Sequence, residues 1–330
     1  MSLQRFNQIF RGYMTLWVIL SIVIGFVFGA AFPAPAHCLK ALVLPLVFIM
    51  IFIMVIPTRP QDFVEVMRSP TEVGLGIFMI IIAAPLIAWP VAISVLRNHP
   101  VLGVGLILAG TVPPGGMIAA WTGLLEGDIP LAIVLQAITL ILGIPEIPLM
   151  LKLLAGSVVP IPISLMVQNL VVIVVLPLVC GFLARWSLFR RMAPARFQAI
   201  RPLFPIISGM SALAVVFVAT SLKADIMLNK PQVIGWAILA AVVFYLVTFV
   251  FSTYISRLFH LNYAKSIPII YGTATKNLSI AIALGLAAFG KSAAVLGVIG
   301  CFMIQMPIAS LFYRFIPQML GRKGTHASSP

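Results

Sequence analysis

Charged residues are scarce in this chain of 330 residues: they make up 8% of it, and only 7 are acidic. A soluble domain carries about 25% charged residues, so this sequence has too little polar surface to face water. Hydrophobic residues make up 62%, and the mean hydropathy is +1.17. The sequence therefore predicts a protein that sits in lipid, one polytopic membrane domain over residues 1–330 with no soluble domain beside it.

The motifs of common enzyme classes are missing as well. The chain contains no HExxH, no GxSxG and no P-loop, the patterns that hold zinc, a serine nucleophile and a nucleotide phosphate. The histidines all fall in expected loops or in the C-terminal tail: His37, His99, His260 and His326. We expect neither an enzyme nor a cofactor, and without a P-loop we exclude ATP-driven transport by this chain alone.

Cysteine is rare, and the positive charge is dispersed. Cys38, Cys180 and Cys301 have apolar neighbours and no CxxC spacing, so we expect small buried side chains and no metal site. The formal net charge is +14, but the basic residues lie in short gaps between apolar runs. Because no basic stripe results, nucleic acid is excluded as a partner.

Long apolar runs separated by proline, glycine and charged residues predict ten transmembrane helices, since about 20 apolar residues cross the hydrocarbon core. We expect these helices at residues 13–32, 38–57, 73–95, 101–125, 129–151, 158–184, 203–222, 233–256, 266–289 and 292–315. The fold class is therefore an all-α membrane protein.

The basic residues give an independent test of this count, because cytoplasmic loops carry an excess of lysine and arginine. With ten helices, the side of the N-terminus holds 14 basic residues and the opposite side, including Lys223, holds 6. Lys276 falls inside a helix and completes the total of 21. We expect a plasma (inner) membrane protein with both termini in the cytoplasm.

Ten helices divide into two halves of five, residues 13–151 and 158–315. An odd number of helices per half inverts the second half relative to the first, as in many secondary transporters. The fourth helix is interrupted at 111–116, and its counterpart in the second half, the ninth helix, is interrupted at 272–277. Corresponding interruptions of this kind indicate a transport site.

The first interruption combines Pro113 and Pro114, which lack backbone donors, with the flexible Gly115 and Gly116. Backbone groups freed at mid-membrane depth are tolerated only when they are buried in protein or line a wet cavity. We therefore expect Pro114, Gly115 and Gly116 to belong to a substrate or ion site. The alternative is a pair of proline kinks that only shape packing.

The second interruption contains Lys276, and a charge at that depth costs at least about 2.5–3.5 kcal/mol. Beside the free carbonyls at the end of a half-helix, its ammonium would stand in for a bound sodium ion or carry a proton in a coupled cycle. The alternative is a fixed structural cation. Gln136 and Gln305 are expected to bond between helices rather than to bind a ligand.

Four neighbouring candidates also have two interpretations each. Thr273, Thr275 and Asn277 offer hydroxyls and an amide that either bind a polar substrate or cap helices. Glu146 is the one acid inside an expected helix, near its end. It either meets Lys276 and couples protons or reaches the lipid headgroups.

At these interruptions the chain resembles the bile acid:sodium symporter superfamily, which includes the arsenite-efflux permeases. Pro114-Gly-Gly116 followed by Glu126-Gly-Asp128 is similar to the symporters' fourth helix, and Ala274-Thr-Lys-Asn277 to their ninth. Met117 and Trp121 are more similar to the permeases. The resemblance implies a core domain built around crossing helices 4 and 9, a panel domain beside it, and alternating access.

The chain departs from that pattern at the ion sites. The resemblance implies a glutamate and a glutamine on sodium where this chain has Gly272 and Lys276, and a Ser-Asn pair where it has Ala119 and Ala120. The loss of oxygen ligands and the gain of an ammonium argue against sodium sites of the usual kind. Pro114 stands where the permeases have a cysteine, so capture of trivalent arsenic by a thiolate is not expected.

We therefore expect a secondary transporter that moves a small organic anion or an arsenite-like oxyacid across the lipid bilayer, with protons as the candidate coupling ion. Two alternatives stay open: a passive channel or facilitator, and a sodium-coupled organic anion symporter with altered ion sites. A channel should carry a continuous polar stripe on several helices, whereas the polar residues here concentrate at the two interruptions.

Overall fold

The computed structural model describes residues 13–57, 69–191, 194–200, 202–290 and 292–321, and the regular structure of these ranges is helical. The first half of the chain contains α2 (Met14–Ala31), α3 (Pro33–Cys38), η1 (Leu39–Leu42), α4 (Val43–Val55), α6 (Pro70–Phe78), η2 (Met79–Ala83), α7 (Ala84–Val95), α8 (Pro100–Thr111), α9 (Met117–Leu124) and α10 (Ile129–Ala155). The second half contains α11 (Ile163–Leu170), η3 (Val171–Val175), α12 (Leu176–Arg191), α13 (Pro194–Ile200), α14 (Leu203–Asn229), α15 (Pro231–Leu258), α16 (Tyr263–Ala274), α17 (Leu278–Phe289) and α18 (Ala294–Met319).

Seven of the described helical segments are long and apolar enough to cross a membrane, and three shorter apolar helices accompany them, Leu16–Ala31, Pro100–Thr111 and Leu278–Phe289. The last two, α8 and α17, reach only about 18 Å at 1.5 Å per residue, short of the roughly 30 Å of hydrocarbon. Each needs the other half of its interrupted helix to complete a crossing, α9 for α8 and α16 for α17. Helix occupies each of the ten ranges expected from the sequence.

The outer surface is apolar where a soluble protein would be polar. On α2, Val23, Ile24 and Val27 are more than half exposed, and on α10 Leu149 and Leu153 are 61% and 72% exposed. A continuous apolar surface of this kind aggregates in water, whereas hydrocarbon accepts it. The chain is therefore a multi-pass membrane protein.

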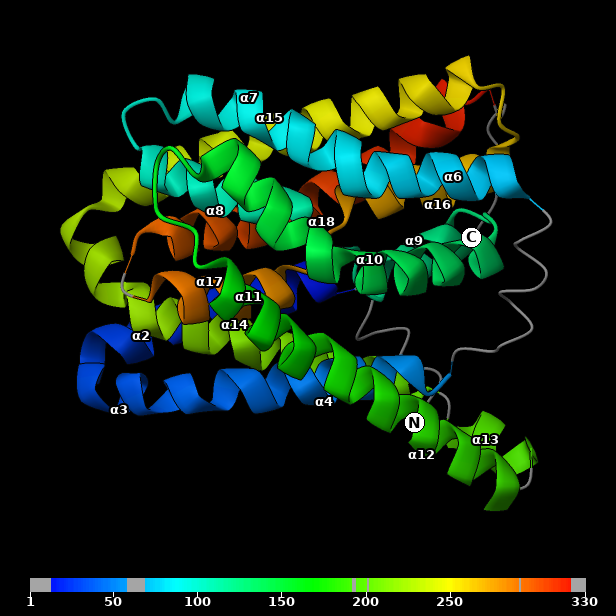
Figure 1. The fold of residues 1–330 in the computed structure, drawn as a ribbon, viewed down its shortest axis with the longest axis horizontal. Helices are drawn as coiled ribbons and strands as arrows, with labels where there is room; N and C mark the ends of the chain where they lie inside the picture. Colours follow the sequence, from blue (N-terminus) through cyan, green and yellow to red (C-terminus); the bar gives the residue numbers. More distant parts are fainter. Residues whose placement is uncertain (1–12, 58–68, 192–193, 201, 291, 322–330) are drawn as a thin grey trace, which may run out of the picture.

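The helices form two groups (Figure 1). The side bundle consists of α2, α3, α4, α12 and α14, with α14 packed against both α2 and α4. The crossing bundle consists of α6 to α10 and α15 to α18, in which α8 packs against α7, α10 and α18. In Figure 1 the blue helices α3 and α4 lie at one edge of the molecule, and α7 and α15 lie at the other.

Within the crossing bundle, α8 and α18 approach each other backbone to backbone. A Cβ atom at Gly105 would lie 1.8 Å from the carbonyl oxygen of Ala294, and one at Gly297 would lie 2.4 Å from that of Leu102. Only glycine permits such a distance, as in other closely packed membrane helices. The close approach brings α18, and Gln305 on it, to the end of α8.

One helix end differs from the expectation in a way that matters for charge. The seventh helix was expected to end at residue 222, but α14 continues to Asn229. Lys223 is therefore not a loop residue: its side chain is only 3% exposed. Hydropathy placed it outside because its tertiary partners, the carbonyls of Gly290 and Ser292, are distant in sequence.

Candidate functional site

The first interruption separates α8 from α9. Val112 is extended, with φ −60° and ψ 146°, because proline disfavours the helical conformation in the residue before it. Pro113 has no N–H to continue the helix, and α9 begins only at Met117, after Gly116. Local sequence is sufficient to explain this break.

The second interruption separates α16 from α17 without any proline. Thr275 (φ −93°, ψ 96°) and Asn277 (φ −81°, ψ 77°) leave the helical region. Lys276 lies between these two residues, and Gln305 of α18 binds both of its backbone groups. The Gln305 side chain accepts from the N–H of Lys276 at 2.9 Å and donates to its carbonyl at 3.1 Å. The hydroxyl of Tyr245 donates to the same amide oxygen at 3.1 Å. The interhelical role expected for Gln305 is confirmed, because its side-chain amide replaces the bonds that a continuous helix would make.

The two interruptions lie directly against each other. The N–H of Asn277 donates to the carbonyl of Pro113 at 2.8 Å, and Pro114 and Lys276 form an antiparallel bridge. A Cβ atom at Gly115 would lie 3.6 Å from the Cβ of Asn277. Polar backbone groups freed inside a membrane protein must find partners, and here the two breaks supply each other.

The Lys276 side chain is 2% exposed, and its Nζ donates to the carbonyl of Ile80 at 3.0 Å. Ile80 lies in the π-helical turn η2, where the N–H of Ala84 bonds to the carbonyl of Met79. The next donor in that register would be residue 85, which is Pro85 and has no N–H. The ammonium therefore binds a backbone carbonyl of another helix, one that Pro85 leaves without a helical donor.

A cavity of about 590 Å³ ends at the crossing, between the two bundles. Gly115, Gly116, Lys276 and Asn277 line its inner end. Four methionines and three phenylalanines form much of the remaining wall, and the other described polar lining residues are Gln136, Ser208, Ser279 and Gln305. The cavity is therefore a largely apolar space whose inner end is lined by Lys276 and Asn277.

Three expected site residues lie at the crossing without lining the cavity: Pro114, Thr273 and Thr275. The hydroxyls of Thr273 and Thr275 donate to the carbonyls of Ile269 and Tyr271, one turn back, at 2.7 and 2.6 Å. Both side chains are at most 1% exposed. Both hydroxyls are therefore bonded to backbone carbonyls of α16, the helix that precedes the break.

Glu146 lies on the other side of the crossing from the cavity. One turn before it, a Cβ atom at Gly143 would lie 3.5 Å from Pro113, and the α10 residues that line the cavity end at Leu140. The Glu146 side chain is 6% exposed. We expected it near the end of its helix, but α10 continues to Ala155, so Glu146 lies well inside the helix. Neither carboxylate oxygen has a hydrogen-bond partner among the described residues. Lys276 lies within electrostatic reach, although its ammonium is bonded to Ile80.

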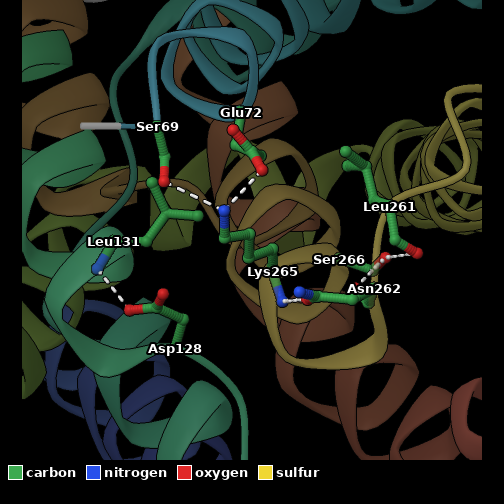
Figure 2. A network of polar contacts seen from close by, with 8 residues as sticks. All are labelled: Ser69, Glu72, Asp128, Leu131, Leu261, Asn262, Lys265 and Ser266. Carbon is green, nitrogen blue, oxygen red and sulfur yellow. Dashed lines mark hydrogen bonds and ion pairs between the residues drawn. The ribbon is translucent and has the colours of Figure 1, made fainter. Parts of the chain in front are cut away.

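A second polar network joins the starts of α6, α10 and α16 (Figure 2). Lys265 donates to Glu72 at 2.5 Å and to Ser69 at 2.9 Å. Asn262 and Asp128 cap α16 and α10 by accepting from backbone N–H groups at 2.9 Å. These contacts anchor the start of α16 to its neighbours. Since Gln305 holds Lys276 just after the other end, α16 is fixed at both ends.

The cysteines differ partly from the expectation. Cys301 is buried, but Cys38 is exposed and Cys180 is half-buried. Apolar sequence neighbours do not imply burial within the protein here, because lipid-facing positions are apolar too. Within the described residues, no three His, Cys, Asp or Glu side chains are grouped as metal ligands would be.

In helical membrane proteins, two interrupted helices that meet beside a cavity are typical of secondary transporters. The model of the Sodium Bile acid symporter family matches residues 44–230, and the chain belongs to this family. This confirms the superfamily expected from the sequence motifs. The chain is therefore a multi-pass membrane transporter of a small molecule and not an enzyme.

Relatives lie on both branches of the superfamily. The chain is 26% identical to YbaS of Bacillus subtilis (strain 168), over 76% of this chain and 81% of that protein. It is 25% identical to the sodium-dependent transporter YocS of the same organism, over 71% of this chain and 70% of YocS. It is 24% identical to the arsenical-resistance protein Acr3 of Corynebacterium glutamicum, over 71% of this chain and 67% of Acr3.

Replacing Gln305 by leucine should disrupt the crossing, because both backbone groups of Lys276 then lose their partner. A buried polar group left without a partner costs about 1–3 kcal/mol, so Gln305→Leu should lower the melting temperature of the detergent-solubilised protein by several degrees. Gln318→Leu, the same change at an exposed position of α18, is the control. Equal melting temperatures for the two variants would contradict this role for Gln305.

Proposed function

We propose that this transporter carries an amphipathic organic anion by alternating access, with substrate and ion binding at the crossing. The carrying observation is the cavity of about 590 Å³ that has apolar walls and ends at Lys276 and Asn277. Its size is that of pockets for drug-sized ligands. An anionic head group would bind at the end lined by Lys276 and Asn277, and an apolar body would pack against methionine and phenylalanine side chains, of which the flexible methionines adapt to varied shapes.

Helix contacts support two inverted halves, residues 13–151 and 158–315. If the halves are equivalent, the pair α7–α8 corresponds to α15–α16, and both pairs are in contact. Likewise, α8 against α18 corresponds to α16 against α10, and α2 against α14 corresponds to α12 against α4. An exchange of halves requires this repetition. The side and crossing bundles would then be the panel and core domains of the family resemblance.

Three features favour independence from sodium. Where the resemblance implies a sodium-binding glutamate, a Cβ atom at Gly272 would lie 2.8 Å from the side chain of Ile118 and 3.1 Å from that of Ile80. Apolar side chains therefore fill the space of that ligand. Ala119 and Ala120 line the cavity with methyl groups, and the ammonium of Lys276 supplies a fixed positive charge.

Arsenite is the second candidate substrate, because Acr3 is named for arsenical resistance. None of the described lining residues is a cysteine, so the soft thiolate ligand that favours trivalent arsenic is not offered here. The large apolar wall also has no counterpart in a small oxyacid. Both points favour the organic anion.

We place the cytoplasm on the arginine-rich side of a plasma (inner) membrane, together with both termini. Pro57, Ile129 and Pro202 line the cavity and lie at helix ends that face this side. The described state would then be inward-facing. A carrier, unlike a channel, must at the same time be closed on the opposite side.

Lys223 is suited to close that opposite side. From α14 of the side bundle, its Nζ donates to the carbonyls of Gly290 and Ser292, each at 3.0 Å, in the turn between α17 and α18. Ser221, on the same helix, donates to Gly25 at 2.9 Å and ties α14 to α2. Opening the far side separates the bundles, so the bonds of Lys223 must break while that of Ser221 persists.

Anion uptake into proteoliposomes should proceed without sodium and depend on Lys276. Bile salt, naphthalenesulfonate and arsenite are the substrates to compare. Lys276→Ala should lower uptake of the organic anions by about tenfold or more, since a buried charge contact is worth about 1.5–3 kcal/mol. Lys230→Ala, at an exposed lysine, is the control. Strict sodium dependence, unchanged uptake in Lys276→Ala, or preference for arsenite would each contradict part of the proposal.

Lys223→Met should raise access to the cavity from the far side. In a background without the native cysteines, Ser279→Cys at the inner end of the cavity reports access to a membrane-impermeant thiol reagent. Labelling from the far side should become several-fold faster with Lys223→Met, because methionine keeps the apolar stem and removes the two bonds. Lys230→Met should leave the rate unchanged. A far-side rate equal in both variants would show that Lys223 does not close this side.

A further inference from the structure

Glu146 is a buried acid that the fold leaves unpaired. It is 6% exposed on α10, and both carboxylate oxygens are without a hydrogen-bond partner in the described part of the chain. An ionised carboxylate in such surroundings costs several kcal/mol unless it is paired. Buried polar groups without partners are few in folded proteins, and each requires an explanation. A ligand that the acid binds and releases would explain this one.

Among the described residues of the elements packed against α10, one charge acts on Glu146. The elements packed against α10 are α6, η2, α8, α9, α11, η3 and α16. Their ionisable residues are Glu72, Tyr263, Lys265 and Tyr271. Glu72 and Lys265 bind each other near the start of α10, distant from Glu146 (Figure 2). The Tyr271 hydroxyl donates to a carbonyl of α18 at 3.0 Å. Lys152 of α10 itself is exposed. The charge acting on Glu146 is therefore that of Lys276, from the break between α16 and α17.

Lys276 has one observed partner for its ammonium and a second acceptor, Glu146, within electrostatic reach. In the described arrangement its ammonium is bonded to the carbonyl of Ile80 at 3.0 Å, and Glu146 is left alone. The carboxylate is the stronger acceptor, because hydrogen bonds between ionised groups are about twice as strong as neutral ones. A change of the Lys276 side-chain rotamer within the crossing bundle would transfer the ammonium from Ile80 to Glu146.

We propose that Glu146 is the binding site of the coupling ion and that this ion is a proton. This rests on the proposed carrier function. While Ile80 holds Lys276, Glu146 is a neutral carboxylic acid. When Lys276 moves to Glu146, the O–H bond breaks, the proton leaves to water on the side that is then open, and an ammonium–carboxylate pair remains. Lys276 keeps its own protons throughout.

Sodium fits this position poorly. The ammonium of Lys276, within electrostatic reach of Glu146, would repel a second cation there. A hard metal cation takes several oxygen ligands, whereas a proton needs one carboxylate oxygen. The surroundings of Glu146 therefore favour a proton over sodium as the bound ion.

Charge balance sets the stoichiometry. With Glu146 protonated, the buried pair carries one positive charge, which one monovalent anion neutralises. With Glu146 ionised, the pair is neutral and the empty site needs no anion. A net charge inside the membrane is unfavourable, so one proton and one monovalent anion should cross together and in the same direction. Transport should then respond to a pH gradient and not to membrane potential.

The test uses naphthalenesulfonate, a permanent monoanion, in proteoliposomes with the full chain. The wild-type carrier should accumulate it under a pH gradient, with no response to an imposed potential. Glu146→Gln fixes the neutral form, so it should reduce accumulation by about tenfold or more while exchange of labelled for unlabelled anion continues. Glu146→Asp should keep accumulation, and Asp225→Asn, at an exposed acid, should resemble the wild type.

Accumulation by Glu146→Gln equal to the wild type would overturn the inference, and so would loss of both accumulation and exchange at an unchanged melting temperature. If Glu146→Gln fails to fold, Glu146→Asp decides: pH-driven accumulation supports the inference, and its loss with exchange intact overturns it. A wild-type protein that exchanges neither naphthalenesulfonate nor a bile salt defeats the proposed carrier function instead.

Discussion

The backbone bonds exchanged between the two interrupted helices are the contacts on which the rest of this structure depends. Lipid offers no hydrogen-bond partner, so every N–H and C=O freed at mid-depth must be satisfied inside the protein. Asn277 bonds to Pro113, and Gln305 holds both backbone groups of Lys276. These bonds fix four half-helices around one point. They also allow a cavity to end there, because the polar groups at its inner end already have partners.

The second constraint is the single ammonium that this crossing contains. Lys276 is nearly inaccessible, and its carbonyl partner exists because Pro85 removes a donor from the π-helical turn of α6–η2–α7. The interruption of one helix and the distortion of another are therefore linked through one side chain. Both Lys276 and Lys223 hold their positions by donating to backbone carbonyls. A carrier with few acids can position its cations in this way and leave Glu146 unpaired.

Local sequence was sufficient for part of this architecture. The apolar runs gave the helix ranges, and the Pro113–Gly116 segment gave the first break with its cause. The second break was located from polar residues, but its cause, Gln305, lies on a helix 29 residues away. The partner of Lys276 lies 196 residues away. Lys223 was misplaced because hydropathy gives a lysine a fixed penalty, whereas two carbonyls at 3.0 Å offset it. Contacts between distant segments are what single-sequence reasoning lacks.

The meeting of the two interruptions can be measured directly with a disulfide. A Cβ atom at position 115 would lie 3.6 Å from the Cβ of Asn277, within the range of about 3.5–4.5 Å that a disulfide requires. In a background without native cysteines, Gly115→Cys with Asn277→Cys should cross-link in the membrane under mild oxidation, whereas Gly235→Cys with Asn277→Cys should not. Absence of the 115–277 cross-link in a folded protein, with both thiols still titratable after denaturation, would contradict the crossing.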